Sequence, residues 1–180
     1  MKRLVIGLAA LLFVASLVLA WLALRAAAPA ALSPPPVVPA QAVHALLDAA
    51  LPDADGKSQA FAQWRGRLLV VNYWATWCTP CRDEMPALAR LQTRYGARGV
   101  QIIGVAIDDA DKVRDFARAH PMNYPLLVAD RAGNEQMRAL GNQAMGLPYT
   151  IVIDRAGQLS AATLGRVHED ALIKLLDAML

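Results

Sequence analysis

The segment Trp77-Cys78-Thr79-Pro80-Cys81 constrains this chain more than any other feature. An apolar run, residues 67–74, ends just before it, and residues with helical spacing begin at once, so the cysteines lie between a strand and a helix. Cys78 is then at a helix N-terminus, where free N–H groups and the helix dipole favour a thiolate. Cys81, three residues later, is close enough to attack a mixed disulfide at Cys78. Two thiols placed in this way can transfer two electrons.

The composition excludes other classes of protein. Both cysteines of the 180-residue chain are in this motif, so no second disulfide supports the fold and the domain must depend on a hydrophobic core. The net charge is +3, but Lys and Arg are scattered along the chain, which argues against a nucleic-acid partner. The hydrophobic content of 56% is high because apolar residues are concentrated in the first thirty positions.

The N-terminus has the pattern of a membrane segment. Lys2 and Arg3 precede residues 4–24, which carry no charge and would form a helix of roughly 30 Å, long enough to cross a bilayer. The alternative is a cleaved signal peptide ending near Ala28-Pro29-Ala30, although the apolar region of a signal peptide is usually shorter, about 7 to 15 residues. The positive charges favour a cytoplasmic N-terminus, so the rest of the chain is expected outside the cytoplasm.

One globular domain follows this segment. We expect a membrane anchor at residues 1–25, an Ala- and Pro-rich extended linker at residues 26–42, and the domain at residues 43–180.

Hydrophobic periodicity predicts alternating strands and helices within the domain. The expected strands are residues 46–51, 67–74, 100–107, 124–128, 149–153 and 159–164, and the expected helices are residues 61–64, the segment from the cysteines to residue 95, and residues 113–120, 135–140 and 168–180. The last two strands form a hairpin across Asp154-Arg155-Ala156-Gly157, and the same four residue types at 130–133 are expected to form a second turn. This pattern predicts an α/β fold in which helices cover both faces of a mixed sheet and the cysteines lie at the strand ends.

A Cys-x-x-Cys pair also occurs in zinc sites, haem attachment sites, copper-delivery domains and structural disulfides. Zinc needs four ligands, and His44, His120 and His168 are not spaced as a second ligand pair. Haem attachment needs His directly after the second cysteine, where this chain has Arg82. No His or Met is spaced to complete a copper site, and a peroxidase would not need a second cysteine so close to the first. We therefore expect no metal and no cofactor.

Several motifs together resemble the thioredoxin superfamily. They are Trp77-Cys78-Thr79-Pro80-Cys81 with the strand before it, Pro86, and Gly146-Leu147-Pro148-Tyr149-Thr150 ahead of Ile151-Val152-Ile153-Asp154. The branch that this chain resembles most is the membrane-anchored TlpA/ResA-like thiol-disulfide reductases of the bacterial cell envelope. The resemblance implies a thioredoxin-like three-layer fold with a central mixed sheet over residues 43–180, preceded by one transmembrane helix. It also implies a single-pass protein of the bacterial inner membrane, with its catalytic domain in the periplasm.

The resemblance assigns roles to residues around the cysteines. It implies that Cys78 is the exposed attacking thiol, that Cys81 is the buried resolving thiol, and that Pro148 is a cis-proline packed against them. Contacts with the substrate are expected from Trp77, Thr79, Pro80 and Leu147. Tyr149 stands where this branch often has a small hydroxyl residue.

Two polar residues bear on proton transfer. Asn72 occupies the position where cytosolic thioredoxins carry a buried carboxylate, and an amide cannot move protons in the same way. Glu84 follows Cys81 by three residues, on the same side of the helix, and matches an acidic residue that the envelope branch uses near its thiols. We expect Glu84 to take part in proton transfer to or from Cys81. The alternative is a solvated carboxylate in the first turn that only interacts with the helix dipole.

These observations predict a protein-disulfide reductase of the cell envelope. The Cys78 thiolate attacks a disulfide of a client protein, and Cys81 then displaces the reduced client and leaves the enzyme oxidised. Electrons from the cytoplasm must arrive through a separate transmembrane thiol carrier, because residues 4–24 contain no cysteine. Apocytochrome c before haem attachment is one expected client. The alternative function is a binding module of the same fold that holds client thiols or delivers metal without turnover.

Overall fold

The computed structural model describes residues 14, 16 and 36–180, and the chain divides into two units, residues 1–30 and 31–180. Among the described residues, no helix has the length and apolar character needed to cross a membrane. The predicted membrane segment at residues 4–24 lies outside the described residues, except for positions 14 and 16. Most of the predicted linker lies outside them too.

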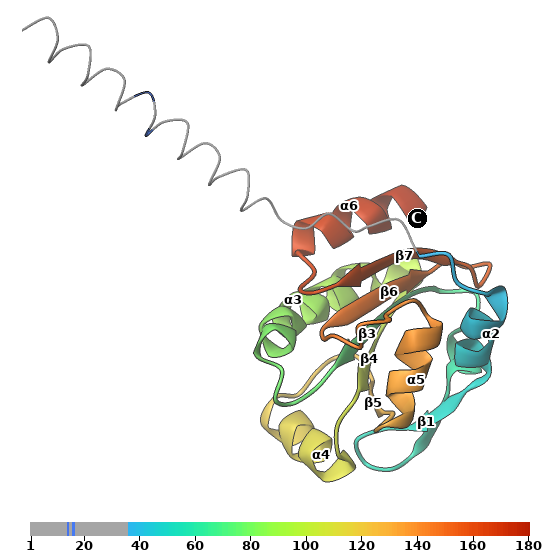
Figure 1. Ribbon diagram of the computed structural model, residues 1–180, viewed down its shortest axis with the longest axis vertical. Coiled ribbons are helices and arrows are strands. Elements are labelled where there is room, and N and C mark those ends of the chain that lie inside the picture. Colours follow the sequence, from blue (N-terminus) through green and yellow to red (C-terminus); the bar gives the residue numbers. More distant parts are fainter. Residues whose placement is uncertain (1–13, 15, 17–35) are drawn as a thin grey trace, which may run out of the picture. The chain divides into compact units, whose positions relative to one another are not determined.

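The elements of the second unit alternate between strands and helices (Figure 1). The strands are β1 (Ala50–Pro52), β2 (Ser58–Ala60), β3 (Leu68–Trp74), β4 (Val100–Ala106), β5 (Leu126–Val128), β6 (Tyr149–Ile153) and β7 (Leu159–Leu164). The helices are α2 (Ala40–Asp48), α3 (Thr79–Tyr95), α4 (Ala110–Ala119), α5 (Ala132–Ala139) and α6 (Glu169–Met179), with short 3-10 helices η1 (Phe61–Trp64) and η2 (Gly96–Arg98). The predicted strands at 67–74 and 100–107, the C-terminal hairpin and the helix after the cysteines are confirmed.

A five-stranded mixed sheet forms the centre of the domain, in the order β5-β4-β3-β6-β7. Strands β3, β4 and β5 are parallel, while β6 runs antiparallel to β3 and β7 runs antiparallel to β6. Strand β3 is therefore central, and all seven of its residues are buried. The prediction of a thioredoxin-like α/β fold with a central mixed sheet is confirmed.

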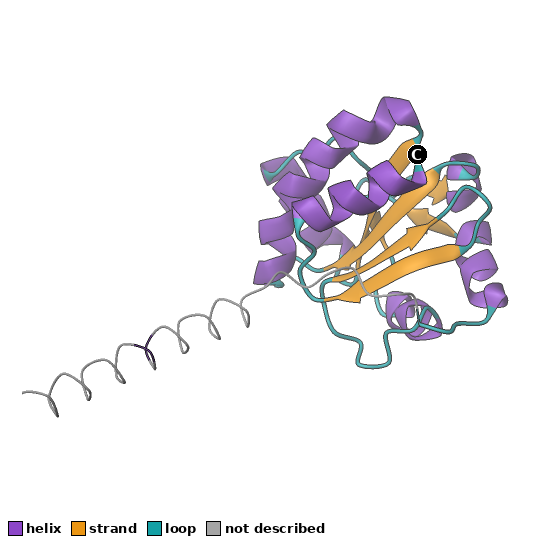
Figure 2. Cartoon of the chain, turned by 90° about the horizontal axis from the view of Figure 1, so that it is seen from above, coloured by secondary structure: helices purple, strands orange, loops and turns teal. Residues whose placement is uncertain are grey.

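Helices cover both faces of this sheet (Figure 2). Because side chains of a strand alternate between the two faces, Leu68 and Val70 of β3 join a core shared with α3, α4 and α6. Leu69 and Val71 join a second core shared with α2, η1 and α5. Asn72 follows the first series, so it faces α3 from a position where its neighbours on that face are apolar.

The beginning of the domain differs from the prediction. Residues 46–51 were expected to form a strand, but α2 extends to Asp48 and only Ala50–Pro52 form β1. The buried side chains of α2 are Val43, Leu46 and Leu47, and this i, i+3, i+4 spacing is that of one helix face packed on a core. A short apolar run does not distinguish strand from helix by itself, and here packing on the sheet decided for the helix. Helix α2 begins at Ala40.

The two copies of Asp-Arg-Ala-Gly both form the predicted turn but continue differently after it. The copy at 154–157 forms the hairpin turn, with the Gly157 N–H donating to the Asp154 carbonyl at 3.0 Å. In the copy at 130–133, the Gly133 N–H donates to the Asp130 carbonyl at 3.2 Å, and the turn leads directly into α5, which begins at Ala132. A Cβ atom on Gly133 would stand 2.2 Å from the Ile107 side chain, so close packing requires glycine at this position.

Candidate active site

Three chain segments meet at one edge of the central sheet. Strands β3 and β4 are parallel and end together, because Trp74 pairs with Ala106. Strand β6 runs the other way and begins at Tyr149, which pairs with Tyr73. The cysteine motif after β3, the segment after β4 and the Gly146–Pro148 segment before β6 therefore all lie at this edge.

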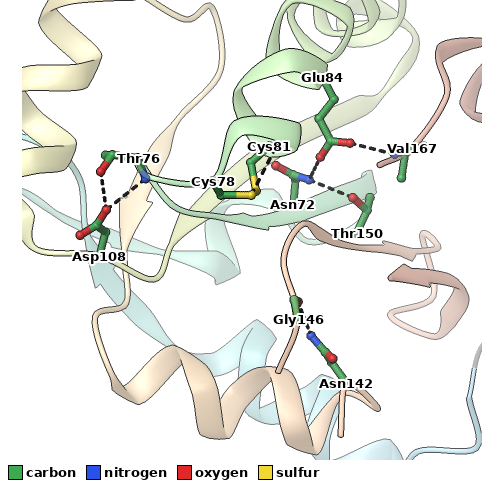
Figure 3. Close-up of a disulfide and its surroundings, with 10 residues drawn as sticks. All are labelled: Asn72, Thr76, Cys78, Cys81, Glu84, Asp108, Asn142, Gly146, Thr150 and Val167. Carbon is green, nitrogen blue, oxygen red and sulfur yellow. Dashed lines mark hydrogen bonds between the residues drawn. A yellow bond between two sulfur atoms is a disulfide. The ribbon is translucent and has the colours of Figure 1, made fainter. Parts of the chain in front are cut away.

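The cysteines form a disulfide at the start of α3 (Figure 3). Their Cα atoms are 5.3 Å apart. Cys78 is the residue that caps the helix, and its Sγ accepts a hydrogen bond from the Cys81 N–H at 3.3 Å. Cys78 retains 5% of its surface exposed, whereas Cys81 is completely buried. A thiolate on Cys78 would receive the same N–H group and the positive end of the helix dipole.

The Asp108 carboxylate, which lies just after β4, binds the turn that precedes Cys78. Asp108 accepts hydrogen bonds from the Thr76 N–H at 3.0 Å and from the Thr76 hydroxyl. Partial burial alone would raise the pKa of Asp108, but the hydrogen bonds from Thr76 and the Asp109 N–H, together with the charge of Lys112, lower it below the usual value. Asp108 is therefore a fixed negative charge that anchors the turn.

A second carboxylate, Glu84, is buried on the other side of the disulfide (Figure 3). Only 1% of Glu84 is exposed. Its Oε1 accepts from the Asn72 side-chain nitrogen at 2.7 Å, and its Oε2 accepts from the Val167 N–H at 2.8 Å. The Asn72 nitrogen also donates to the Thr150 hydroxyl at 2.9 Å. In Figure 3, Asn72 lies between the disulfide and Glu84.

Burial raises the pKa of Glu84 to about 7, although the hydrogen bonds from Val167 and Asn72 and the charge of Arg166 oppose this change. A carboxyl group with this pKa changes its charge near neutral pH, as a general acid or base must. The alternative from the sequence, a solvated first-turn carboxylate, is wrong because Glu84 is buried. The prediction that Glu84 takes part in proton transfer remains a prediction.

The peptide bond between Leu147 and Pro148 is cis, which confirms the prediction that Pro148 is a cis-proline. Leu147 is partly buried and packs against both cores. The following Tyr149 is directed inward, and its hydroxyl donates to the Leu140 carbonyl at 2.6 Å. Burial raises the pKa of Tyr149 to about 12, so it remains a neutral hydrogen-bond donor at neutral pH.

The remaining residues expected to contact substrate are at the surface. Trp77 has 67% of its area exposed, and Thr79 and Pro80 are also exposed. Two further exposed apolar residues escaped the sequence analysis, Met145 and Leu164. Met145 precedes Gly146, and Leu164 lies within 3.0 Å of the place where a Cβ atom on Gly146 would stand. Their exposure depends on how β7 pairs with β6, which no local pattern reports.

The described part of the chain offers no group of three or more His, Cys, Asp or Glu side chains that could hold a metal ion. The chemistry available at this edge is that of two sulfur atoms, one titrating carboxyl group and a surface with exposed apolar side chains. This set of groups suits thiol-disulfide exchange.

Comparison with known proteins points to the same chemistry. A family model described as Redoxin matches residues 37–179. The thiol-disulfide oxidoreductase ResA of Bacillus thuringiensis subsp. konkukian is 31% identical over 121 residues, which cover 67% of this chain and 68% of ResA. The thioredoxin-like protein YneN of Bacillus subtilis is 28% identical over 134 residues, which cover 72% of this chain and 75% of YneN.

Solved structures have the same fold. A Chlorobium tepidum protein described as a thiol:disulfide interchange protein DsbE superposes with a TM-score of 0.67 at 26% sequence identity. The match covers 82% of this chain and 98% of that protein.

Proposed function

This chain belongs to the Redoxin family of thiol-disulfide oxidoreductases, and from that premise we propose that it reduces disulfide bonds of client proteins in the bacterial cell envelope. The observation that carries the proposal is the asymmetry of the two sulfur atoms. Cys78 caps α3 and keeps part of its surface exposed, while Cys81 is completely buried behind it. We therefore assign the reaction with a client to Cys78, the less buried of the two, and the reaction that resolves the mixed disulfide to Cys81.

The reaction proceeds by two exchanges. The Cys78 thiolate attacks one sulfur of the client disulfide, a mixed disulfide forms, and the other client sulfur leaves as a thiolate that takes a proton from water. Cys81 then loses its proton to the Glu84 carboxylate and attacks Cys78 Sγ. This second step releases the second client thiol and forms the Cys78–Cys81 disulfide. Two electrons pass from the enzyme to the client.

In this proposal the protein acts as a reductant, so electrons pass from its two cysteines to the client. Strong oxidants stabilise their reactive thiolate heavily, often with a cation between the cysteines, whereas Thr79 and Pro80 carry no charge. In this direction the buried Glu84 would accept the Cys81 proton, and in the reverse direction it would return it. A measured reduction potential of about −120 mV, at the oxidant end of the known range, would show that the protein acts as an oxidant instead.

We further propose that residues 4–24 anchor the chain in the inner membrane with the domain in the periplasm. Re-reduction in that compartment requires a transmembrane thiol carrier, because residues 4–24 contain no cysteine. Apocytochrome c before haem attachment is the client class proposed for this site. Trp77, Met145 and Leu164 are exposed apolar side chains that an unfolded client segment would contact under this proposal. Fractionation of cells that express the full chain, or a variant without residues 4–24, tests the anchor, and release of the full chain by carbonate washing would contradict it.

The test of turnover is reduction of insulin coupled to dithiothreitol. We expect the wild type to accelerate the reaction and Cys78→Ser to give only the uncatalysed rate. Equal rates for the two proteins would overturn the enzyme function and leave the binding module. Cys81→Ser should accumulate mixed disulfides, because the resolving step is blocked, and the trapped proteins would identify the clients.

A further inference from the structure

A polar cleft opens beside Glu84, on the side of α3 that faces the segment between β7 and α6. Its volume is about 460 Å³. Asp83 and Glu84 of α3 line it from one side, and residues 166–170 line it from the other. Because the Val167 N–H donates to Glu84 Oε2, this carboxyl oxygen is directed toward the cleft, while Oε1 is directed toward Asn72.

Arg166 is the cation of this cleft that bears on Glu84. It immediately precedes Val167, its side chain is exposed, and its guanidinium lies 3.5 Å from the carbonyl oxygen of Asp83, the residue before Glu84. The other cation from α3, Arg90, forms an ion pair with Glu169 at 2.5 Å. Arg166 is therefore close to Glu84 in space although 82 positions separate them in the chain.

Groups of both charges surround Glu84. The ionisable side chains that line the cleft besides Glu84 and Arg166 are Asp83, Arg90, His168, Glu169 and Asp170. On the inner side, Tyr124 presents a buried hydroxyl without a hydrogen-bond partner, and the charge of Glu84 raises the pKa of this phenol beyond the effect of burial. Arg90 is paired with Glu169, so Arg166 is the cation that offsets the charges of Asp83 and Asp170.

We propose that this cleft is the side from which Glu84 exchanges its proton with water, and that Arg166 is a positioning residue that favours the ionised form of Glu84. The inference rests on the proposed function, because it supplies the carboxylate that accepts the Cys81 proton. The proton moves from the Cys81 thiol to Glu84, and from the Glu84 carboxyl group to water in the cleft. No electrons are transferred in either step.

The test is a titration of the Glu84 carboxyl carbon by NMR in the oxidised full-length protein, with Glu84→Gln used to assign the signal. Arg166→Gln should raise the midpoint by about 0.5 pH unit, and Arg166→Glu by about twice as much. Arg166→Lys should restore the wild-type midpoint. The matched control is Arg82→Gln, which removes the same charge from exposed α3 surface outside the cleft and should leave the midpoint unchanged.

The contrary outcomes separate this inference from the function itself. If the Arg166 and Arg82 variants shift the midpoint equally, net charge explains the effect and the inference is overturned. The oxidised protein has no free thiols, so this titration does not depend on turnover. Insulin reduction by the wild type with an unmoved midpoint in Arg166→Gln would leave the proposed function intact and remove only the role of Arg166. At 1 M salt the shift should shrink, because an exposed charge is screened.

Discussion

Two carboxylates are buried on either side of the disulfide, and the structure treats them differently. Asp108 accepts two hydrogen bonds from Thr76 and one from Asp109, and the pKa of Asp108 is below its usual value. Glu84 is buried more deeply and has only two hydrogen bonds, and its pKa is raised to about 7. The number of donors and the depth of burial decide which carboxylate keeps its charge.

Because of this difference in pKa, the two carboxylates can have different roles in the site. A carboxylate that stays charged can hold the turn before Cys78 in one position at any neutral pH. A carboxyl group that titrates near neutral pH can accept and release a proton during turnover. The same residue class therefore serves as a fixed anchor at the end of β4 and as a candidate proton carrier on α3.

The largest expected effect is on the pH dependence of stability at Glu84. The folded pKa of about 7 lies above the ordinary value of 4.5, so the folded chain binds more protons than the unfolded chain between these values. Wild-type stability should therefore fall by about 3 kcal/mol as the pH rises from 4.5 to 7. Glu84→Gln should lack this fall. Urea denaturation of the oxidised proteins across this range measures the difference, and parallel profiles would show that Glu84 does not titrate there.

Asp108→Asn should have the next largest effect, with the opposite pH dependence. The amide offers one acceptor for three donors, so we expect a loss of about 2 kcal/mol at pH 7. Because the folded pKa of Asp108 is lowered, its contribution is present above the unfolded pKa of 3.8 and disappears as the pH falls through the folded value. Asp109→Asn, at the exposed neighbour, is the control in the same denaturation experiment. An equal loss in both variants would contradict the anchoring role.

Thr150→Val should cost less, about 1 kcal/mol in the free energy of unfolding at pH 7. The substitution conserves shape and removes the hydroxyl that accepts from Asn72 at 2.9 Å. Thr150→Ser keeps the hydroxyl and should remain close to the wild type. If Thr150→Val is as stable as Thr150→Ser, the bond between Asn72 and Glu84 does not depend on this third residue.

Trp77→Ala should have the smallest effect on stability, under about 0.5 kcal/mol, because the ring is 67% exposed. The pH profile set by Glu84 should be unchanged. The rate with insulin should fall, while the rate with a small disulfide such as oxidised glutathione should not, because only a protein client is large enough to contact the ring. Equal losses with both substrates would indicate that Trp77 shields the cysteines and does not bind clients.

The sequence predicted those parts of the fold where the local pattern of apolar residues is compatible with only one type of secondary structure. The long strand at 67–74 and the helix after the cysteines were recognised because their apolar residues follow a single period over several turns or residues. Residues 46–51 were assigned wrongly because Leu46 and Leu47 fit a strand as well as the buried face of a helix. Packing against the second core made that choice.

The site divides in the same way. The cysteines, Pro148 and Glu84 belong to short motifs, so their positions could be read from the sequence. Thr150 and Val167 were missed because their partners are distant in the chain, 78 positions from Asn72 to Thr150 and 83 from Glu84 to Val167. The anchoring role of Asp108 also escaped, because Thr76 lies 32 positions away.

By itself, the sequence determined that two sulfur atoms stand at the start of a helix after a central strand, because a motif and a period are properties of neighbouring residues. Only the tertiary structure decided that Glu84 is buried and titrates near neutral pH, while Asp108 remains charged. Burial and hydrogen-bond partners depend on which distant segments pack together. The two copies of Asp-Arg-Ala-Gly make the same point, since one begins a helix against Ile107 and the other turns a hairpin.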